Sequence, residues 1–508
     1  MSSSSNEDIA IKAEGRSAPP PYEEVATPPN GQADGVNGLG KQDSGVRIDD
    51  FGASLERSPE ELAVVRKLDM YCLPIIWLMY FFNFLDRSAM VNGKLDGLAD
   101  DLDLKGTQYN TCISILFVGY LVGQVPSNMV LSRVRPSFYL AGFNAMWSLV
   151  TLLTYKAYDY KTMIVCRFLL GLFEAPFFPG VTYLLGTLYT RKEIATRLSI
   201  FFTGNLVASA ISGPFAAGVF QLDGRAGLAG WRCNCSCNGD KLFIIQGALS
   251  LAVAIPAFYM LPNKPLTTPW LTPEQRQLAH DRIERDTTNR TGGGKTTVLD
   301  GLSQAVRDWK TWAFCLLSNL NVTTLGFLNF LPTLVRTLGF NTSAALALTS
   351  PPYVVAMIVS VWLAHHSGRT NERTWHITAC EVVAILGFVM CAATLNTGVR
   401  YAGIMLFVGS LAGVTNIVIG WTSSSLGQTD EKRAVAMAMA NTCANLASVY
   451  TPYLWPDVDS PRFIKATAAS AVFCAAVVAM VWFLRWMLRR KNDQMRKADP
   501  LAENFFVY

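Results

Sequence analysis

The sequence has little charge and few groups suited to catalysis. Only 16% of its 508 residues are Asp, Glu, Lys or Arg, compared with about 25% in an ordinary soluble domain. It contains four histidines, and they form neither a metal-binding motif nor a nucleophile with its base, which argues against a membrane enzyme. The formal net charge of +5 is modest and gathers at the edges of apolar segments, so the sequence gives no case for a nucleic-acid partner.

The cysteines do not form a standard metal motif either. Most of the eleven stand singly in apolar segments, where a free cysteine behaves as a small hydrophobic residue. Cys233, Cys235 and Cys237 cluster in RCNCSCNGD, but their C-x-C-x-C spacing departs from the usual C-x-x-C pattern of zinc sites. We therefore expect an extramembrane loop there, and no metal or other cofactor apart from protons as the coupling ion.

The first 60 residues lack the pattern of a secretory signal, because no positive region is followed by a short apolar one. They are rich in Ser, Gly, Pro and Asp, which predicts a disordered tail. Within the tail, Pro19, Pro20 and Tyr22 belong to PPPY, a pattern that WW domains recognise as polyproline II. A WW-domain trafficking partner and a plain linker are both consistent with this short motif.

Long apolar stretches, in contrast, are abundant. Hydrophobic residues make up 51% of the chain. Charge-poor stretches of about 20 residues, long enough to cross a hydrocarbon core about 30 Å thick, recur along it. Twelve such segments have the approximate bounds 70–92, 110–131, 137–155, 162–188, 198–220, 242–261, 309–333, 345–365, 376–394, 400–424, 434–454 and 466–488. The predicted fold class is an all-α membrane protein with 12 transmembrane helices.

The longest polar stretch inside the chain divides these segments six and six. The expected parts are a cytoplasmic tail at 1–60, a six-helix bundle at 61–261, a cytoplasmic connector at 262–308, a second bundle at 309–490 and a cytoplasmic tail at 491–508. FFNFLD at 81–86 returns as FLNFLP at 327–332, which suggests two similar halves with a substrate site near the midplane between them. Pro332 replaces Asp86 in the second copy, so we expect the charged chemistry in the first half only.

An even number of spans places both termini on one side of the membrane. Lys and Arg crowd the short turns on that side, as at Arg135, Arg191 and Lys432. Positive loops of this kind mark the cytoplasmic face. We therefore expect a multi-pass plasma-membrane protein with both termini in the cytoplasm.

Charged residues interrupt the first and fourth apolar segments. Asp86 and Arg87 follow sixteen residues without a formal charge, Met70 to Leu85. A charge at the centre of a membrane helix costs about 2.5 to 3.5 kcal/mol and is by default a functional hypothesis. Arg167 and Glu174 are seven residues apart and so share one helix face. We expect Asp86 to face both arginines, and Glu174 to lie deeper and farther from positive charge, where it can accept a proton.

The two arginines exceed what Asp86 alone neutralises, and a guanidinium binds a carboxylate through two hydrogen bonds. The expected substrate is therefore a small organic anion. Moving an anion into a negative interior costs about 2.3 kcal/mol per charge per 100 mV, so we expect proton coupling through Asp86 and Glu174. The alternative is a static network that fixes helix packing, with Arg87 reaching toward the interface.

Around these residues the sequence resembles the major facilitator superfamily, and within it the anion:cation symporters of the fungal allantoate permease group. The resemblance covers about residues 60–490. It rests on LDRS (85–88), VGYLVGQVPSN (118–128), RFLLGLFEAPFFPG (167–180), FLPTLVRTLGF (330–340), PPYVV (351–355), GWTSSSLG (420–427), KRAVAMAMAN (432–441) and PYLWP (452–456). The chain departs from the family pattern in additional residues from Cys233 to Asp240 and in Gln246, where the family usually has Glu.

The resemblance implies proton-coupled uptake of a small carboxylate or vitamin, such as allantoate, nicotinate, pantothenate, biotin or tartrate, by alternating access. It implies proton coupling at Asp86 and Glu174 and anion binding at Arg87 and Arg167. It also implies cavity-lining roles, each of which could equally be a packing role, for Asn83, Tyr120, Asn205, Trp421 and Asn441. The chain is expected to act as a monomer.

Two rival functions stay open from the sequence. A drug or metabolite exporter of the same superfamily would confer resistance instead of growth on a carboxylate. A membrane receptor would bind its ligand without accumulating it, and the repeat of two halves disfavours this alternative.

Overall fold

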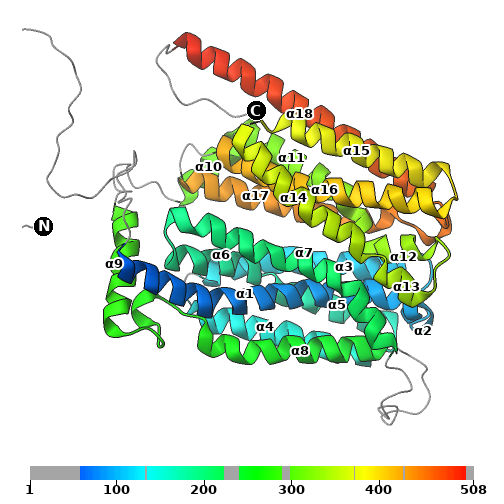
Figure 1. The fold of residues 1–508 in the computed structure, drawn as a ribbon, viewed down its shortest axis with the longest axis horizontal. Coiled ribbons are helices and arrows are strands. Elements are labelled where there is room, and N and C mark those ends of the chain that lie inside the picture. Colours follow the sequence, from blue (N-terminus) through cyan, green and yellow to red (C-terminus); the bar gives the residue numbers. More distant parts are fainter. Residues whose placement is uncertain are drawn as a thin grey trace, which may run out of the picture. The chain divides into compact units, whose positions relative to one another are not determined.

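The computed structural model describes residues 58–131, 134–221, 239–288, 298–370, 372–426 and 430–498. Within these ranges every regular element is an α-helix or a short 3₁₀ helix (Figure 1). This confirms the predicted all-α fold class. The PPPY motif and the cluster of three cysteines lie outside the described residues.

The first half of the chain forms one set of membrane-length helices. Its helices are α1 (Pro59–Gly93), α2 (Leu98–Asp101), α3 (Gln108–Leu131), α4 (Pro136–Leu153), α5 (Tyr160–Glu174), α6 (Phe177–Leu188), α7 (Arg191–Gln221) and α8 (Gly239–Met260). The fourth expected span is a pair, α5 and α6. Pro176 separates them, because proline lacks a backbone N–H and its ring clashes with the preceding turn. Glu174 is thereby the last residue of α5.

The second half follows the same plan. Its helices are α11 (Trp309–Thr324), α12 (Leu331–Arg336), α13 (Thr342–Ala347), α14 (Ser350–Thr370), α15 (Thr374–Ala393), α16 (Thr397–Ser425), α17 (Asp430–Tyr450) and α18 (Ile464–Ala498). The FLNFLP copy lies in a 3₁₀ segment, Leu325–Phe330, and the start of α12, whereas FFNFLD lies in the regular helix α1. Pro332 explains the difference, because proline favours the first turn of a new helix.

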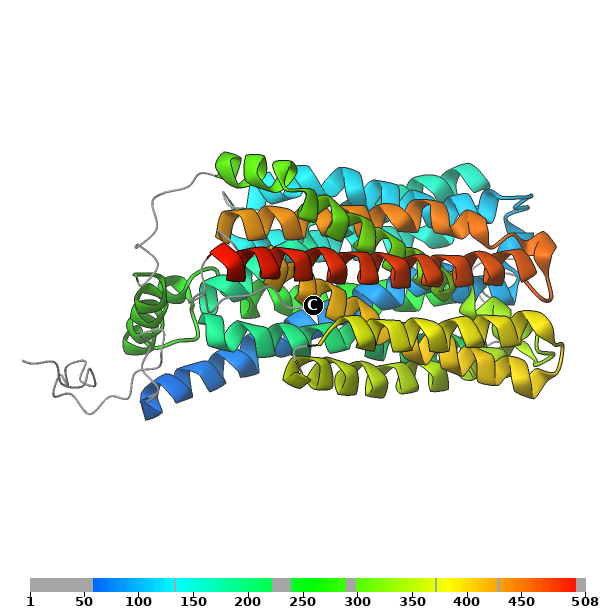
Figure 2. The ribbon, with the colours of Figure 1, turned by 90° about the horizontal axis from the view of Figure 1, so that it is seen from above.

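All twelve predicted spans correspond to these helices or helix pairs. Among the described residues, nine are long and apolar enough to cross a membrane. The other three, α3, α4 and α17, run between the same two ends of the bundle (Figures 1 and 2). The start of α1 and the end of α18 lie at one end, which we call the terminal end, and the opposite one is the loop end (Figure 1).

Glycines allow α3 and α5 to pack closely. A Cβ atom on Gly171 would lie 1.9 Å from the carbonyl oxygen of Leu116, and one on Gly119 would lie 2.2 Å from that of Phe168. Such small residues let the backbones of membrane helices approach each other. The close crossing fixes the helix that carries Arg167 and Glu174.

The connector between the halves contains α9 (Pro273–Thr288) and α10 (Val298–Arg307). α9 lies at the terminal end of the first half (Figure 1). Arg282 donates to Glu193 at 3.1 Å and to the carbonyl of Leu188 at 2.9 Å, and Arg285 donates to Glu61 at 2.9 Å. These contacts attach α9 to the ends of α1, α6 and α7.

Candidate functional site

A cavity of about 360 Å³ lies between the two halves. Polar side chains of the first half that line it include Arg87, Arg167, Asn205 and Ser209, and those of the second half include Asn329, Tyr353 and Asn445. Its volume falls within the range of about 300 to 1,000 Å³ that is usual for small-molecule sites. The cavity therefore combines the size of a small metabolite with two cationic side chains.

Arg87 and Glu174 form a buried ion pair at this cavity. Arg87 Nε donates to Glu174 Oε2 at 2.6 Å, and the Glu174 side chain is fully buried while that of Arg87 is 20% exposed. The guanidinium also lies over the rings of Phe84 and Tyr120, with 5.1 and 5.3 Å to the centroids. Asn83 faces Glu174 from the preceding turn of α1. Arg87 therefore lines the cavity and at the same time binds the buried carboxylate of Glu174.

Asp86 occupies a different environment from the one we expected. It is fully buried, and both carboxyl oxygens lack a hydrogen-bond partner. It faces Thr151 of α4 and Ser250 of α8. Its direction differs from that of Arg87 because consecutive side chains on a helix point about 100° apart. The expectation that Glu174 stands away from positive charge is wrong, because Glu174 is the partner of Arg87. Of the two arginines expected to face Asp86, Arg87 pairs with Glu174 instead, whereas Arg167 interacts with Asp86 electrostatically.

Arg167 is the second cation of the cavity. It is 3% exposed, and its Nε and Nη2 atoms are buried without a hydrogen-bond partner. Its guanidinium carbon lies 5.9 Å from the ring centroid of Phe243. A guanidinium in this condition has donors available for an anion that enters the cavity.

Of the other predicted site residues, some lie at the cavity and others pack elsewhere in the bundle. Asn205 lines the cavity and accepts a hydrogen bond from Ser209 at 3.3 Å. Tyr120 reaches the site through its contact with Arg87. Trp421 is fully buried and packs edge to face on Phe314 at 5.4 Å, away from the residues that line the cavity.

Asn441 also lies outside the set of cavity-lining residues. It accepts a hydrogen bond from Asn445, whose Nδ2 lies 2.9 Å from its carbonyl oxygen. Asn445, one turn along α17, lines the cavity instead. The family resemblance implied a cavity-lining role for Asn441, whereas the structure places Asn445 at the cavity.

Sequence reasoning also missed a carboxyl group in the second half. Glu381 lies in α15, is fully buried, and has no hydrogen-bond partner for either carboxyl oxygen. It faces Cys474 of α18 and does not line the cavity. The criterion that identified Asp86, a charge inside an apolar segment, would have found it. Buried acidic side chains are therefore not confined to the first half.

The two halves make polar contacts at the loop end. Lys94, just after α1, bonds both carboxylate oxygens of Asp457, which precedes α18, at 2.6 and 2.8 Å. Tyr453 donates to Thr111 at 3.0 Å. Ser350, at the start of α14, bonds the carbonyl of Ala210 in α7. These contacts join the two halves on the loop side of the cavity.

Comparison with known proteins agrees with this architecture. The family model described as Major Facilitator Superfamily matches residues 76–452. The MFS-type transporter efuF of Hormonema carpetanum is 30% identical, over 85% of this chain and 86% of that protein. The high-affinity nicotinic acid transporter of Saccharomyces cerevisiae is 27% identical, over 88% of this chain and 82% of that protein.

Two further similarities extend the comparison. The pantothenate transporter liz1 of Schizosaccharomyces pombe is 25% identical, over 88% of this chain and 86% of that protein. Among solved structures, a bacterial homologue of the human lysosomal transporter Spinster, in an inward-facing and occupied conformation, superposes with a TM-score of 0.65. It is 14% identical and covers 82% of this chain and 96% of that chain. This likeness concerns the fold alone.

Proposed function

This chain belongs to the Major Facilitator Superfamily, and from that membership we propose that it imports a small organic anion together with protons. It is a multi-pass membrane transporter and not an enzyme. The observation that carries the proposal is the buried Arg167 guanidinium, with free donors, in the same cavity as the Arg87–Glu174 pair.

The arginines account for recognition of an anion. A planar guanidinium binds a carboxylate through two parallel hydrogen bonds, and Arg167 has buried donors without a partner. The relatives described as nicotinic acid and pantothenate transporters support a small carboxylate or a vitamin as the substrate class. Allantoate, biotin and tartrate belong to the same chemical class.

Glu174 accounts for coupling to protons. When its carboxylate binds a proton, the charge that holds Arg87 is lost, and the guanidinium becomes available to the substrate. Asp86 provides a second acid, because an ionised carboxylate buried without a partner is costly and protonation removes that cost. Two protons per anion would drive uptake, since each charge moved is worth about 2.3 kcal/mol per 100 mV.

Alternating access completes the cycle. In this proposal the contacts at the loop end belong to one state of the cycle, in which the two halves are joined on that side. We propose that the chain lies in the plasma membrane with its terminal end in the cytoplasm. Lys and Arg are dense in the short turns at that end, which is typical of the cytoplasmic face. In that orientation the structure corresponds to a state closed to the exterior.

The test is uptake of a panel of labelled carboxylates by cells that express the chain, at acidic and at neutral external pH, with and without a protonophore. We expect accumulation that rises with acidity and collapses with the protonophore. Accumulation that ignores the protonophore would refute coupling. Resistance to drugs without uptake of any carboxylate would instead identify an exporter.

A further inference from the structure

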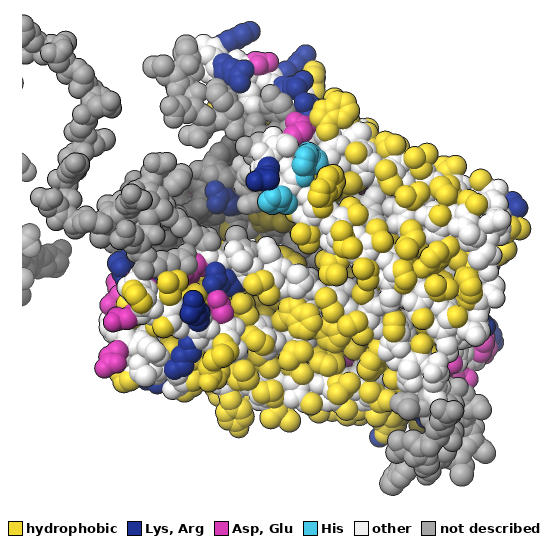
Figure 3. Space-filling model, in the orientation of Figure 1, with side chains coloured by type: hydrophobic (Ala, Val, Ile, Leu, Met, Phe, Trp, Pro, Cys, Tyr) yellow, Lys and Arg dark blue, Asp and Glu magenta, His cyan; other side chains and the backbone are white. Residues whose placement is uncertain are grey.

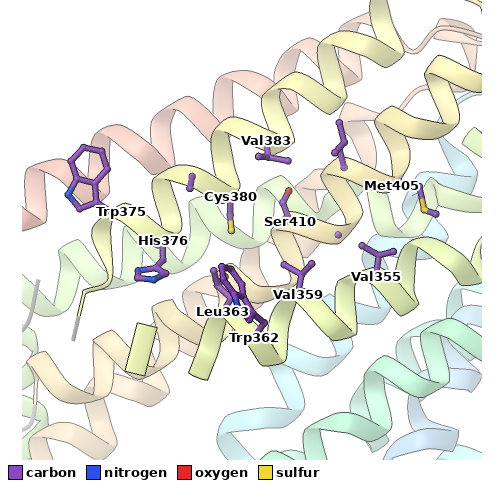
Figure 4. A pocket seen from close by; sticks show the side chains of 13 residues that line it. Val355, Val359, Trp362, Leu363, Trp375, His376, Cys380, Val383, Met405 and Ser410 are labelled. Atoms are coloured by element: carbon purple, nitrogen blue, oxygen red, sulfur yellow. The ribbon is translucent and has the colours of Figure 1, made fainter. Parts of the chain in front are cut away.

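A second hollow lies on the outside of the second half, between α14, α15 and α16. Its volume is about 430 Å³, and Figure 4 shows Cys380 and Val383 of α15 across from Val359 and Leu363 of α14. Most of the side chains that line it are apolar, such as Val355, Val359, Leu363, Val383, Met405 and Leu406. The small residues Ala379 and Gly409 also line it. We call it the outer groove.

The outer groove faces the lipid and not the transport cavity. Trp362 and Trp375, which line it, are 60% and 55% exposed, and Ile358 and Val361 on the same helix as Trp362 are each 63% exposed. Hydrophobic side chains cover this face of the bundle (Figure 3). Among the described residues that line the groove, none is Asp, Glu, Lys or Arg. In a membrane such a surface contacts acyl chains.

One end of the outer groove is polar and basic. His376 lines it, and its Nε2 lies 2.7 Å from Nδ1 of His366. The ring of His366 stacks on Trp362 with 5.4 Å between centroids. Arg369 follows His366 by three residues, so it lies on the same face of α14. Figure 3 shows histidines and basic side chains together at the terminal end of the hydrophobic face.

We propose that the outer groove binds one acyl chain of an anionic phospholipid, with the phosphate at His366, His376 and Arg369. The groove runs over nine residues of α15, from Trp375 to Val383, and the eight steps between them span about 12 Å at 1.5 Å per residue. A chain in the groove places the headgroup at its basic end. The positive charge of Arg369 matches a phosphate, and the hydrogen-bonded pair of histidines lies beside it, whereas a sterol hydroxyl has no charge to offer. This inference does not depend on the transported substrate.

The experiment is photo-cross-linking of the full-length protein in nanodiscs that contain phosphatidylserine with a diazirine on its acyl chain. We expect labelled peptides from α14, α15 and α16. Ala379→Trp should lower this labelling by about fivefold or more, because its ring fills the groove. Ile255→Trp is the control, since Ile255 is 63% exposed on α8 in the other half. Equal labelling of the two variants would overturn the proposal.

The headgroup is tested separately. With the same diazirine on phosphatidylcholine, the wild type should be labelled less than with phosphatidylserine, and Arg369→Ala combined with His366→Ala should remove the difference. Equal labelling of the wild type by both lipids, or preferential labelling by a photoactivatable sterol, would refute an anionic phospholipid. Should Ala379→Trp fail to elute as the wild type does, Ala379→Leu fills part of the same space and decides the question.

Discussion

Arg87 is held by a carboxylate on one side and open to the cavity on the other. Its Nε is bound to Glu174 at 2.6 Å, and its guanidinium carbon lies over the rings of Phe84 and Tyr120. These rings stabilise a cation whichever state Glu174 adopts. When Arg87 is released from Glu174, Arg87 therefore loses a hydrogen bond, but the two aromatic rings still stabilise its positive charge.

Glu174→Gln should separate coupling from binding. The amide removes the negative charge permanently, as a bound proton would, so Arg87 stays available to the anion while proton-driven accumulation is lost. We expect concentrative uptake to fall by about tenfold or more, equivalent to at least about 1.4 kcal/mol, while exchange of labelled for unlabelled substrate persists. Uptake and counterflow assays measure the two quantities.

A carboxyl far from the cavity provides the matched control for this change. Glu274 is exposed at the start of α9, and Glu274→Gln should leave both assays unchanged. If acid-stimulated accumulation survived Glu174→Gln at the wild-type level, the proton acceptor would have to be another group.

Arg167→Lys should weaken substrate recognition. Lysine keeps the charge but loses the planar pair of donors that binds a carboxylate. We expect the KM to rise by about tenfold, or about 1.4 kcal/mol, with a smaller effect on the maximal rate. Concentration-dependent uptake is the measurement, and Arg66→Lys, on an exposed face of α1, is the control. An unchanged KM would favour a packing role for Arg167.

The positions of the buried charges could be predicted from the sequence, but not their pairing. Asp86, Arg87, Arg167 and Glu174 stand out because each interrupts an apolar segment. Their partners depend on the rotation of α1 and on the depth of α5, and an error of one position turns a helical side chain by about 100°. The assignment of Glu174 as the carboxyl far from positive charge was wrong for this reason.

At the scale of elements, the crossing of α3 and α5 sets the position of the site. Gly119 and Gly171 bring the two backbones together, and Arg167 and Glu174 lie four residues before and three residues after Gly171. A change in this crossing would move both charged groups. The depth of the charges thus depends on residues that carry no charge.

Gly171→Ala should destabilise the protein and impair transport. Its Cβ would lie 1.9 Å from the carbonyl oxygen of Leu116, which forces α3 and α5 apart, and such overpacking costs about 1 to 3 kcal/mol. We expect a lower temperature of thermal unfolding in detergent. Gly142→Ala in α4 is the control, because a Cβ there meets nothing within 4 Å. Equal unfolding temperatures for the two variants would contradict this account of the crossing.

The sequence predicts where the helices are and says less about where they break. All twelve spans were located by apolar length, which a hydrocarbon core of about 30 Å imposes on any crossing segment. The separation of α5 from α6 and the 3₁₀ segment before α12 depend on Pro176 and Pro332. A proline inside a span can either kink a helix or end it, as Pro74 within the continuous α1 illustrates.

At the scale of the whole molecule, the loop-end contacts would bias the equilibrium between the two states of the proposed transport cycle. The Lys94 and Asp457 side chains are 12% and 49% exposed, and pairs near solvent contribute about 0 to 1 kcal/mol. A pair of this strength biases the equilibrium without blocking it. Transport requires that bias to be modest, since the contact must open in every cycle.

Exchanging the charges of this pair tests its role. Lys94→Asp alone and Asp457→Lys alone should each shift the population toward the state open at the loop end by up to about fivefold, as expected for about 1 kcal/mol. The double variant should restore the original balance. The readout is the labelling rate of Asn329→Cys by an impermeant thiol reagent, compared with the parent chain. Additive effects of the two changes would exclude a direct interaction.

The Lys94–Asp457 contact joins residues 363 positions apart in the chain. At about 5 to 20 residues per second, the ribosome needs about 20 to 70 seconds to proceed from one to the other. During biogenesis the first spans therefore enter the bilayer well before their closing partner exists. The Lys94–Asp457 contact cannot form until nearly all of the chain has been translated, so chains that stop before Asp457 should lack this contact between the two halves.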